Sequence, residues 1–403
     1  MNIIFLTMTD IPDLECRYIY TELMKVFIQK GHSVTIVSPG EKTNKKYQIC
    51  KREGYTLIKI KILQGGKSNL IKKGLNTVFL ESWYIRAIKK CLNTQKFDLV
   101  LYSTPPITLC RAVNYLKKRD GAVTYLMLKD IFPQNALDLH ILEKKGWKKI
   151  LYYYFRQKEK RLYQSSDYIG CMSPENTRYL LQHNEFIDKN KVGLCVNSVQ
   201  PLEEKIINKE ELRKKRGIPK NKIVFFYGGN FGKPQGIDYL INLLDSVRNN
   251  NKCFFVLCGN GAEYLKIRAH VDNGKFDNVL LINGLPKQEY DGLLQACDVG
   301  MIFLDYNFTI PNYPSRILPY MEYGIPVFAA TDEVTDIKDA IQEGKFGWWC
   351  PSNNVERGKA IIEDICNQQQ LAELGLNGRK YLMKYFTADI TYNQIMEKIN
   401  HGA

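Results

Sequence analysis

Short apolar runs alternate along the chain with longer segments in which apolar residues recur every three or four positions. This alternation is typical of strand–helix units built around parallel sheets. In the first half it predicts strands at residues 3–6, 34–37, 55–60, 99–102, 123–128, 168–171 and 192–196. Helices are expected near residues 17–30, 76–93, 106–118, 148–164 and 174–183, and Gly31 is placed to end the first of them.

The alternation resumes after residues 200–222, a stretch rich in lysine and glutamate that has the character of a linker. Further strands are expected at 223–227, 254–258, 279–282, 299–303, 327–330 and 347–349. Helices are expected near 236–248, 262–271, 287–296, 315–323, 335–343, 355–367, 370–385 and 389–400. The predicted fold class is α/β, with two Rossmann-like domains in tandem. Their bounds are 1–199 and 200–385, and a final helical segment, 386–403, is expected to pack back on the first domain.

The charge of the chain is uneven. The 403 residues contain 57 Lys and Arg against 42 Asp and Glu, a net charge of +15. Residues 1–200 hold 33 basic and 17 acidic side chains, whereas the remainder holds 24 and 25. This asymmetry indicates an anionic partner for the first half: nucleic acid, an acidic membrane surface or a phosphorylated substrate. Because no nucleic-acid-binding module is recognisable, nucleic acid is not expected as a partner.

Metal and disulfide chemistry find little support in the sequence. The eleven cysteines are scattered without a Cys-x-x-Cys pair, which is typical of buried cytosolic cysteines. The five histidines show no metal-ligand spacing, and no Asp-x-Asp occurs, so we expect neither metal nor cofactor. The apolar start of the chain is expected to be a buried strand and not a signal peptide, and no apolar run is long enough to span a membrane.

A glycine-rich turn follows the strand expected at 223–227, with the sequence Tyr227-Gly228-Gly229-Asn230-Phe231-Gly232-Lys233. Glycines allow backbone N–H groups to approach an anion, and the following helix adds positive potential. Lys233 would supply a full charge. The alternative is a tight strand-to-helix turn that holds no ligand.

A second segment of interest begins at Asn312. Pro314 and Ser315 suit the start of a helix and Gly324 suits its end, so Arg316 would fall in the first turn. Beside free backbone N–H groups, Arg316 would form a second site for an anion. The alternative is an ordinary solvated arginine.

In order along the chain, these segments resemble the family 4 glycosyltransferases of GT-B architecture. The residues that carry the likeness are Gly229-Asn230-Phe231-Gly232 with Gly236, Gly259-Asn260-Gly261, Asn283-Gly284-Leu285, Ala296-Cys297-Asp298, the Pro-Ser-Arg segment at 314–316 and Gly-x-Pro-Val at 324–327. In the first half, Gly31-His32 and Ser173-Pro174 with Asn197 are similar too. Residues 129–135 look like a stretch of bacterial members that build O-antigen, capsule or exopolysaccharide, among which the N-acetylfucosaminyltransferase-type members are the nearest likeness.

The resemblance implies a GT-B fold with parallel sheets facing a central cleft, an acceptor-binding first domain and a second domain that binds a nucleotide diphosphate sugar. Lys233 and Arg316 match positions that grip the diphosphate and stabilise the leaving group. The backbone of Leu285 matches a position that reads the base. The implied donor-binding set is Gly229, Asn230, Gly232, Lys233, Gly261, Leu285, Pro314, Ser315 and Arg316.

Asp130 follows a strand at the edge where the family places a residue beside the transferring sugar. It is expected either to act in catalysis or sugar orientation, or to cap a helix or turn. The remaining candidates on the acceptor side are Asp10, Arg17, Gln134, Asn135 and His140.

The sequence departs from the family at two positions. Glutamates that contact the donor sugar and ribose are replaced by Pro311 and Pro319. Since a proline side chain accepts no hydrogen bond, Glu322 is the candidate to take over ribose recognition.

The likeness implies a retaining transferase, moving a UDP-linked sugar such as an N-acetylated deoxyhexosamine to a polyprenyl-diphosphate-linked glycan. Lys233 and Arg316 would serve in place of a metal ion. Two alternatives stay open: a nucleotide-sugar epimerase of the same fold, and a non-catalytic glycan- or lipid-binding partner. Residues 144–156 mix lysines with large aromatics, so the helix expected there either docks on an acidic membrane or is half buried with a solvated lysine face. The first reading, with the acceptor lipid, predicts a peripheral protein on the cytoplasmic side of the membrane.

Overall fold

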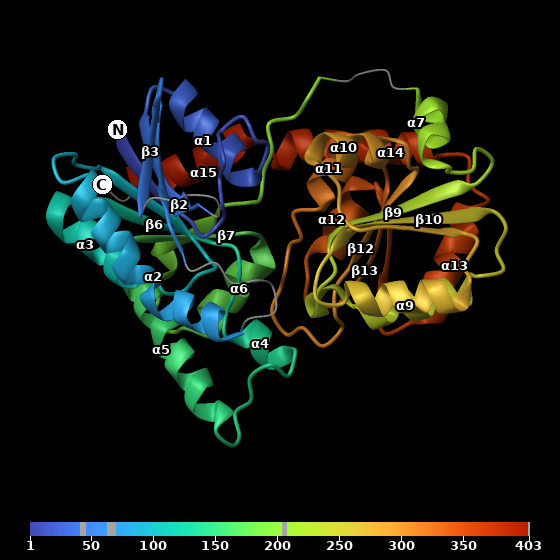
Figure 1. Ribbon diagram of the computed structural model, residues 1–403, viewed down its shortest axis with the longest axis horizontal. Coiled ribbons are helices and arrows are strands. Elements are labelled where there is room, and N and C mark those ends of the chain that lie inside the picture. Colours follow the sequence, from blue (N-terminus) through green and yellow to red (C-terminus); the bar gives the residue numbers. More distant parts are fainter. Residues whose placement is uncertain (41–45, 63–69, 204–207, 402–403) are drawn as a thin grey trace. The chain divides into compact units, whose positions relative to one another are not determined.

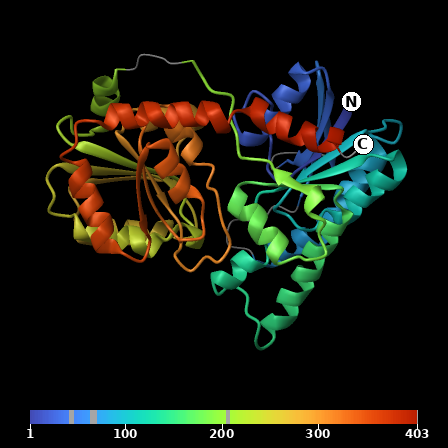
Figure 2. The same cartoon turned by 180° about the vertical axis from the view of Figure 1, so that it is seen from behind.

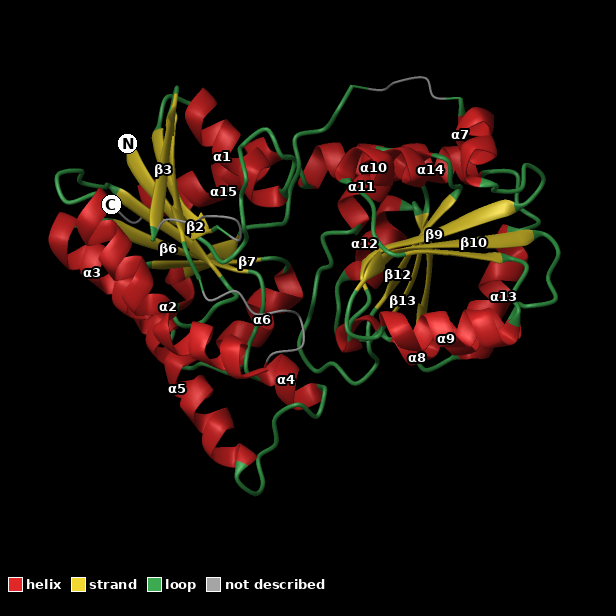
Figure 3. Ribbon diagram, in the orientation of Figure 1, coloured by secondary structure: helices red, strands yellow, loops and turns green. Residues whose placement is uncertain are grey.

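The computed structural model describes residues 1–40, 46–62, 70–203 and 208–401, without the side chains of residues 70–78 and 401. The chain divides into two compact units (Figure 1). Unit 1 consists of Met1–Gln200 together with Ala388–Ala403, and unit 2 consists of Pro201–Thr387. Each unit is built on its own sheet with helices packed against it, so each is described separately (Figure 3).

Unit 1 contains an eight-stranded sheet in the order β3-β4-β2-β1-β5-β6-β7-β8. Its strands are β1 (Asn2–Leu6), β2 (Ser33–Pro39), β3 (Tyr47–Arg52), β4 (Tyr55–Ile60), β5 (Leu99–Ser103), β6 (Val123–Leu128), β7 (Tyr168–Cys171) and β8 (Val192–Leu194). Its helices are α1 (Ile19–Gln29), α2 (Leu70–Cys91), α3 (Cys110–Asp120), α4 (Gln134–Asp138), α5 (Lys148–Ser165), α6 (Pro174–Gln182), the 3₁₀ turn η1 (Lys189–Lys191) and α15 (Ala388–His401). All strand pairs are parallel except β3 with β4.

Unit 2 contains a six-stranded parallel sheet in the order β11-β10-β9-β12-β13-β14. Its strands are β9 (Ile223–Asn230), β10 (Cys253–Asn260), β11 (Val279–Ile282), β12 (Val299–Phe303), β13 (Val327–Thr331) and β14 (Gly347–Pro351). Its helices are α7 (Lys209–Arg216), the 3₁₀ turn η2 (Lys233–Gln235), α8 (Ile237–Ser246), α9 (Tyr264–Gly274), α10 (Lys287–Gln295), α11 (Ile317–Glu322), α12 (Ile337–Gly344), α13 (Val355–Ile365) and α14 (Leu371–Tyr385).

The predicted strands are all present. Most of their apolar runs are buried, as the inner strands of parallel sheets require, whereas the edge strands β8, β11 and β14 are only partly buried. The prediction missed β3, which pairs antiparallel at the edge of the sheet and is mostly exposed, so its sequence lacks an apolar run. The expected linker is only partly a linker. Residues 209–216 form α7, and Arg213 on this helix donates hydrogen bonds to Ala296 O (2.8 Å) and Asp298 Oδ2 (2.5 Å) of unit 2.

The last helix, α15, packs on unit 1. Ile395 and Ile399 join the core that Phe27 of α1 helps to form. The ring of Tyr392 meets Phe27 edge to face, and its hydroxyl lies 3.0 Å from His32 Nε2. The end of the chain therefore completes the core of the unit in which the chain begins (Figure 2).

Candidate functional site

The glycine-rich turn of unit 2 leaves the carboxyl end of β9. Gly229 has φ 112°, a conformation that disfavours side chains, and a Cβ built there would lie 3.8 Å from Arg316 Nη2. Arg316, distant in sequence, therefore reaches the turn that carries Lys233. Lys233 itself opens η2 and is exposed.

The turns after β9, β10 and β11 adjoin one another at this edge. Phe231 N donates to Asn260 O (2.9 Å), and a Cβ on Gly261 would collide with Phe231 O at 2.3 Å. Gly284 follows β11, and a Cβ there would lie 3.3 Å from Asn260 Nδ2. Leu285, the next residue, is half-buried at the start of the loop to α10. The edge thus gathers most of the expected donor-binding residues.

Two of those residues are used within the turn. Gln235 Oε1 accepts hydrogen bonds from Gly232 N and from Asn230 Nδ2, each at 3.1 Å. These bonds fix the shape of the turn, so Asn230 and Gly232 act here on its conformation. The contribution of Gln235 was not predicted.

Arg316 is the most unusual side chain at this edge. Its guanidinium lies over the ring of Tyr227, with Cζ 4.6 Å from the ring centroid. Within the described part of the chain it forms no ion pair, and its buried Nη1 has no hydrogen-bond partner. A buried cation without a counter-ion is costly, which makes this position suited to an anionic ligand.

Arg316 lies within the tight turn that leads into α11 and is the N-cap residue of that helix. Ile317 N donates to Pro314 O (3.2 Å) and Leu318 N donates to Ser315 O (3.1 Å). The helix α11 begins at Ile317, one residue later than Arg316. Pro314 is half-buried and Ser315 is exposed, so both shape the approach of Arg316 to the turn after β9.

Asp332 anchors the segment that leads to Arg316, a role that the sequence analysis missed. Asp332 Oδ1 accepts from Thr335 N (2.9 Å), and its Oδ2 accepts from Thr335 Oγ1 (3.2 Å). Thr335 Oγ1 in turn accepts from Asn312 N (3.1 Å). Burial raises the pKa of the Asp332 carboxyl to about 6 although these bonds oppose the shift. Its position directly after β13, at the carboxyl edge, was the available signal.

The structure places Glu322 away from this edge, which corrects its expected role in ribose recognition. Because β12 and β13 are parallel, α11 runs from the carboxyl edge back toward the amino edge of the sheet, and Glu322 is its last residue. The side chain is 4% exposed, and its Oε1 accepts from Leu202 N (2.9 Å). Glu322 therefore holds the entry of the chain into unit 2.

In unit 1, Asp130 follows β6 at the carboxyl edge of the sheet. Asn135 Nδ2 donates to both carboxylate oxygens, at 2.7 and 2.9 Å. Burial raises the pKa of Asp130 to about 6, although the bonds from the Ile131 backbone and Asn135 lower it. The buried Oδ1 of Asn135 has no partner within the described residues. A carboxylate and a free amide oxygen together suit sugar hydroxyl groups.

The other acceptor-side candidates do not join Asp130. Asp10 forms an ion pair with buried Lys59, and Arg17 donates from Nη2 to Gln200 O (2.7 Å). Gln134 donates to Asp138 Oδ1 (2.7 Å). His140 is exposed, has φ 57° in the turn after α4, and donates from its backbone N to Leu137 O (3.0 Å).

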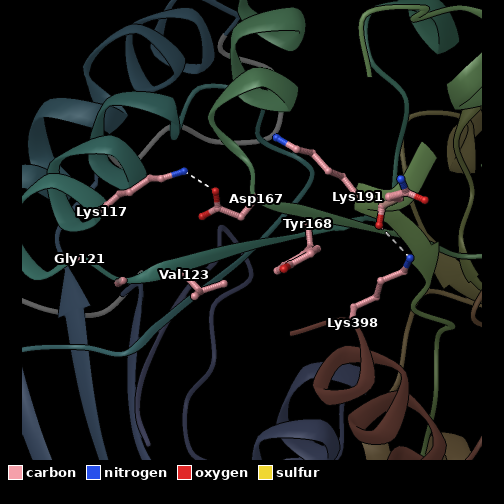
Figure 4. A pocket seen from close by; sticks show the side chains of 9 residues that line it. Lys117, Gly121, Val123, Asp167, Tyr168, Lys191 and Lys398 are labelled. Atoms are coloured by element: carbon pink, nitrogen blue, oxygen red, sulfur yellow. Dashed lines mark hydrogen bonds and ion pairs between the residues drawn. The ribbon is translucent and has the colours of Figure 1, made fainter. Parts of the chain in front are cut away.

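A hollow of about 640 Å³ in unit 1 lies elsewhere, at the amino ends of β6 and β7 (Figure 4). Lys117 points into it and pairs with Asp167 Oδ1 at 2.5 Å, while Lys398 donates to Asn190 O at 3.0 Å. Parallel sheets bind ligands at the opposite edge, so this hollow is not part of the candidate site.

Across the ranges given above, no three His, Cys, Asp or Glu side chains gather in a way that could hold a metal ion. Nor does any helix there have the length and apolar character needed to cross a bilayer.

Comparison with known proteins finds a family model that matches most of unit 2. Residues 208–381 match the family described as "Glycosyl transferases group 1". A "Probable glycosyltransferase WbjE" of Pseudomonas aeruginosa is 25% identical over 338 residues, which cover 82% of this chain and 81% of that protein.

Solved structures share the fold of the whole chain. The sucrose-phosphate synthase of Thermosynechococcus elongatus superposes with a TM-score of 0.74 at 16% identity, covering 100% of both chains. "WaaG, a glycosyltransferase involved in lipopolysaccharide biosynthesis", superposes with a TM-score of 0.67 at 15% identity, covering 97% and 98%. Anabaena Alr3699/HepE in complex with UDP superposes with a TM-score of 0.68 at 14% identity, covering 100% of both chains. The fold of this chain is that of the GT-B enzymes, as expected.

Proposed function

We propose that the protein is a retaining glycosyltransferase of surface polysaccharide synthesis, a proposal supported by the match of residues 208–381 to the group 1 glycosyl transferases. It moves a sugar from a UDP-linked donor to a polyprenyl-diphosphate-linked glycan on the cytoplasmic face of the membrane. The name of WbjE supports glycosyl transfer, the lipopolysaccharide biosynthesis of WaaG supports the pathway, and the UDP bound to HepE supports the donor. The resemblance to N-acetylfucosaminyltransferase-type members makes an N-acetylated deoxyhexosamine the first sugar to test.

The single observation that carries the proposal is the buried guanidinium of Arg316. Its Nη1 lacks a partner in the described part of the chain, and its Nη2 faces the backbone of Gly229. A diphosphate at this turn would supply the missing acceptor, and Lys233 on the same turn would add a second cation. Charge-assisted bonds of this kind are roughly twice as strong as neutral ones.

In the reaction, the bond between the anomeric carbon and the β-phosphate oxygen breaks, and negative charge develops on the diphosphate. Arg316 and Lys233 stabilise that charge, which takes the place of a divalent ion in this proposal. An acceptor hydroxyl attacks the same face of the sugar and passes its proton to the departing phosphate oxygen. The products are UDP and the extended glycan, with the anomeric configuration retained.

Asp130 and Asn135 orient sugar hydroxyl groups in this proposal. The ionised carboxylate accepts a hydroxyl proton in a hydrogen bond, and the free Oδ1 of Asn135 accepts a second. The donor-binding assignment of Gly261, Leu285, Pro314 and Ser315 rests on the adjoining turns described above.

The test is UDP release from UDP-sugars in the presence of a lipid-linked acceptor. Lys233→Ala and Arg316→Ala should each lower kcat by about 10²-fold or more, as loss of a leaving-group contact does. Lys214→Ala on α7 and Arg248→Ala, a cation stacked on Phe276, remove the same charges elsewhere in unit 2 and should leave the rate unchanged. Donor conversion without acceptor would indicate an epimerase, and full in-cell function of the double variant would indicate a non-catalytic partner.

A further inference from the structure

Helix α5 carries apolar side chains on two faces, only one of which packs on unit 1. Tyr152, Leu162 and Tyr163 are buried against the unit. A helix that only covers a sheet needs a single apolar stripe, with polar residues on its opposite face. The second face therefore calls for a different explanation.

The exposed face forms a continuous stripe of large residues. Trp147, Ile150, Leu151 and Tyr154 follow one another at the i, i+3, i+4, i+7 spacing and are all exposed. Trp147 is 71% exposed and Ile150 is 74% exposed. We call these four residues the α5 stripe. Figures 1 and 2 show the first turns of α5 and the loop before it extending past the sheet of unit 1.

Cations surround the α5 stripe. Residues 141–161 contain six lysines and two arginines against two glutamates, a net charge of +6. The two glutamates are already paired, Glu143 with Lys148 at 2.6 Å and Glu159 with Arg156. The same helical face continues beyond Tyr154 with Lys158 and Arg161, and the Lys158 ammonium lies 5.8 Å from the centre of the Tyr154 ring.

We propose that the α5 stripe and its lysines dock this protein on an acidic lipid bilayer, with Trp147 and Ile150 entering the boundary between headgroups and acyl chains. A row of tryptophan, isoleucine, leucine and tyrosine flanked by lysines matches an interface that is apolar inside and anionic at its rim. The inference rests on the proposed function only in that a lipid-linked acceptor brings the enzyme to a bilayer. Unit 1 would then present its sugar-binding edge to membrane-borne substrates.

The test is flotation of the full chain with vesicles of phosphatidylcholine containing 30% phosphatidylglycerol, beside vesicles of phosphatidylcholine alone. The acidic vesicles should bind the protein, and binding should weaken with salt because the attraction is screened. Lys145→Glu with Lys149→Glu should weaken binding by about fivefold or more per position. Lys214→Glu, an exposed lysine of α7 in unit 2, should leave it unchanged.

The apolar part is tested by Trp147→Ser with Ile150→Ser, which should weaken vesicle binding at least about tenfold. The matched control is Leu265→Ser in unit 2, a side chain that is 72% exposed. In the wild type, acidic vesicles should shift tryptophan fluorescence to the blue, and Trp147→Phe should abolish the shift.

Equal vesicle binding by the stripe variants and the wild type would overturn the proposal. The proposal would also be overturned if the wild type did not bind acidic vesicles. This includes the outcome in which the α5 stripe joins two copies of the chain and binds no vesicles. Calorimetric binding of UDP in the absence of vesicles reports on the donor site alone, so failure of docking and failure of the proposed function remain distinguishable.

Discussion

At the scale of single residues, each unit has one buried ionisable group that stands out because the described residues offer it few partners. Arg316 stacks on Tyr227 and leaves Nη1 without an acceptor within the described residues. In unit 1, Asn135 and the backbone of Ile131 are the described groups whose hydrogen bonds favour the ionised form of Asp130. Fully paired surface charges are common and carry little information, whereas buried and incompletely paired ones cluster at functional sites.

The pH dependence of turnover should depend on Asp130. Its pKa is raised to about 6, so the ionised form that accepts sugar hydroxyls is lost, and the rate should fall, as the pH drops through about 6. Asn135→Leu removes a hydrogen-bond donor to the ionised carboxylate, so the fall in rate (the acid limb of the pH–rate profile) should move to higher pH. Asp130→Asn should abolish this acid limb. A pH–rate profile measures both effects, and an unmoved limb in both variants would contradict the assignment.

The same carboxyl predicts a stability effect of defined sign. Because its folded pKa lies above the unfolded value, the native state holds the proton while the unfolded state releases it between about pH 4 and 6. The contribution of Asp130 to the free energy of unfolding therefore falls as the pH rises through that window. In the variant Asp130→Asn, the free energy of unfolding should change less with pH across this window. Denaturant titrations at several pH values measure this change without measuring turnover.

At the scale of elements, the carboxyl edge of the second sheet is held by bonds between successive turns. The turn after β13 reaches the segment before α11 through Thr335, which both donates to Asp332 and accepts from Asn312. The turn after β10 is tied to that after β9 through Phe231 and Asn260. Arg316 depends on this framework for its position.

Thr335→Val should therefore destabilise unit 2 and weaken donor binding together. The valine leaves Asp332 Oδ2 and the Asn312 N–H without the hydroxyl that they contact. This loss should lower the free energy of unfolding by about 1–3 kcal/mol. The KM for the donor should rise more than kcat falls, because the effect on Arg316 is positional. Thr335→Ser keeps the hydroxyl and should restore both values. If Thr335→Val and the wild type have the same KM for the donor, Thr335 does not help to position the donor site.

The strands and most helices were predictable because parallel strands are apolar throughout and their helices have a buried stripe. Strand β3 was not, since an exposed antiparallel edge leaves no such run. The turns after β9 and before α11 were found from glycine, proline and arginine. The partners that shape them, Gln235, Tyr227 and Asp332, were not, because each contact joins residues whose relation only the folded backbone reveals. Glu322 was misplaced because its position on α11 was judged without the direction of the helix.

At the scale of the whole molecule, charge and chemistry are divided between the two units. Residues 1–200 carry the basic excess, 33 basic against 17 acidic side chains, and contain Asp130 and the α5 stripe. The remainder is close to neutral, 24 against 25, yet holds the guanidinium at the glycine turn. In the function proposed above, residues 1–200 serve the membrane and the acceptor, and the remainder binds the donor. The basic excess of residues 1–200 attracts an anionic surface over a long range, whereas the donor is held by local, buried contacts.

The central claim, that Arg316 and Lys233 hold a diphosphate, is tested most directly by calorimetric titration with UDP and with uridine. The ratio of the two dissociation constants isolates the diphosphate. Two charge-assisted contacts should give the wild type a preference for UDP of about 100-fold or more. Each alanine variant should lower that ratio about tenfold and the double variant should nearly abolish it, while Arg248→Ala and Lys214→Ala keep it. A double variant that retains the full preference for UDP would contradict the account.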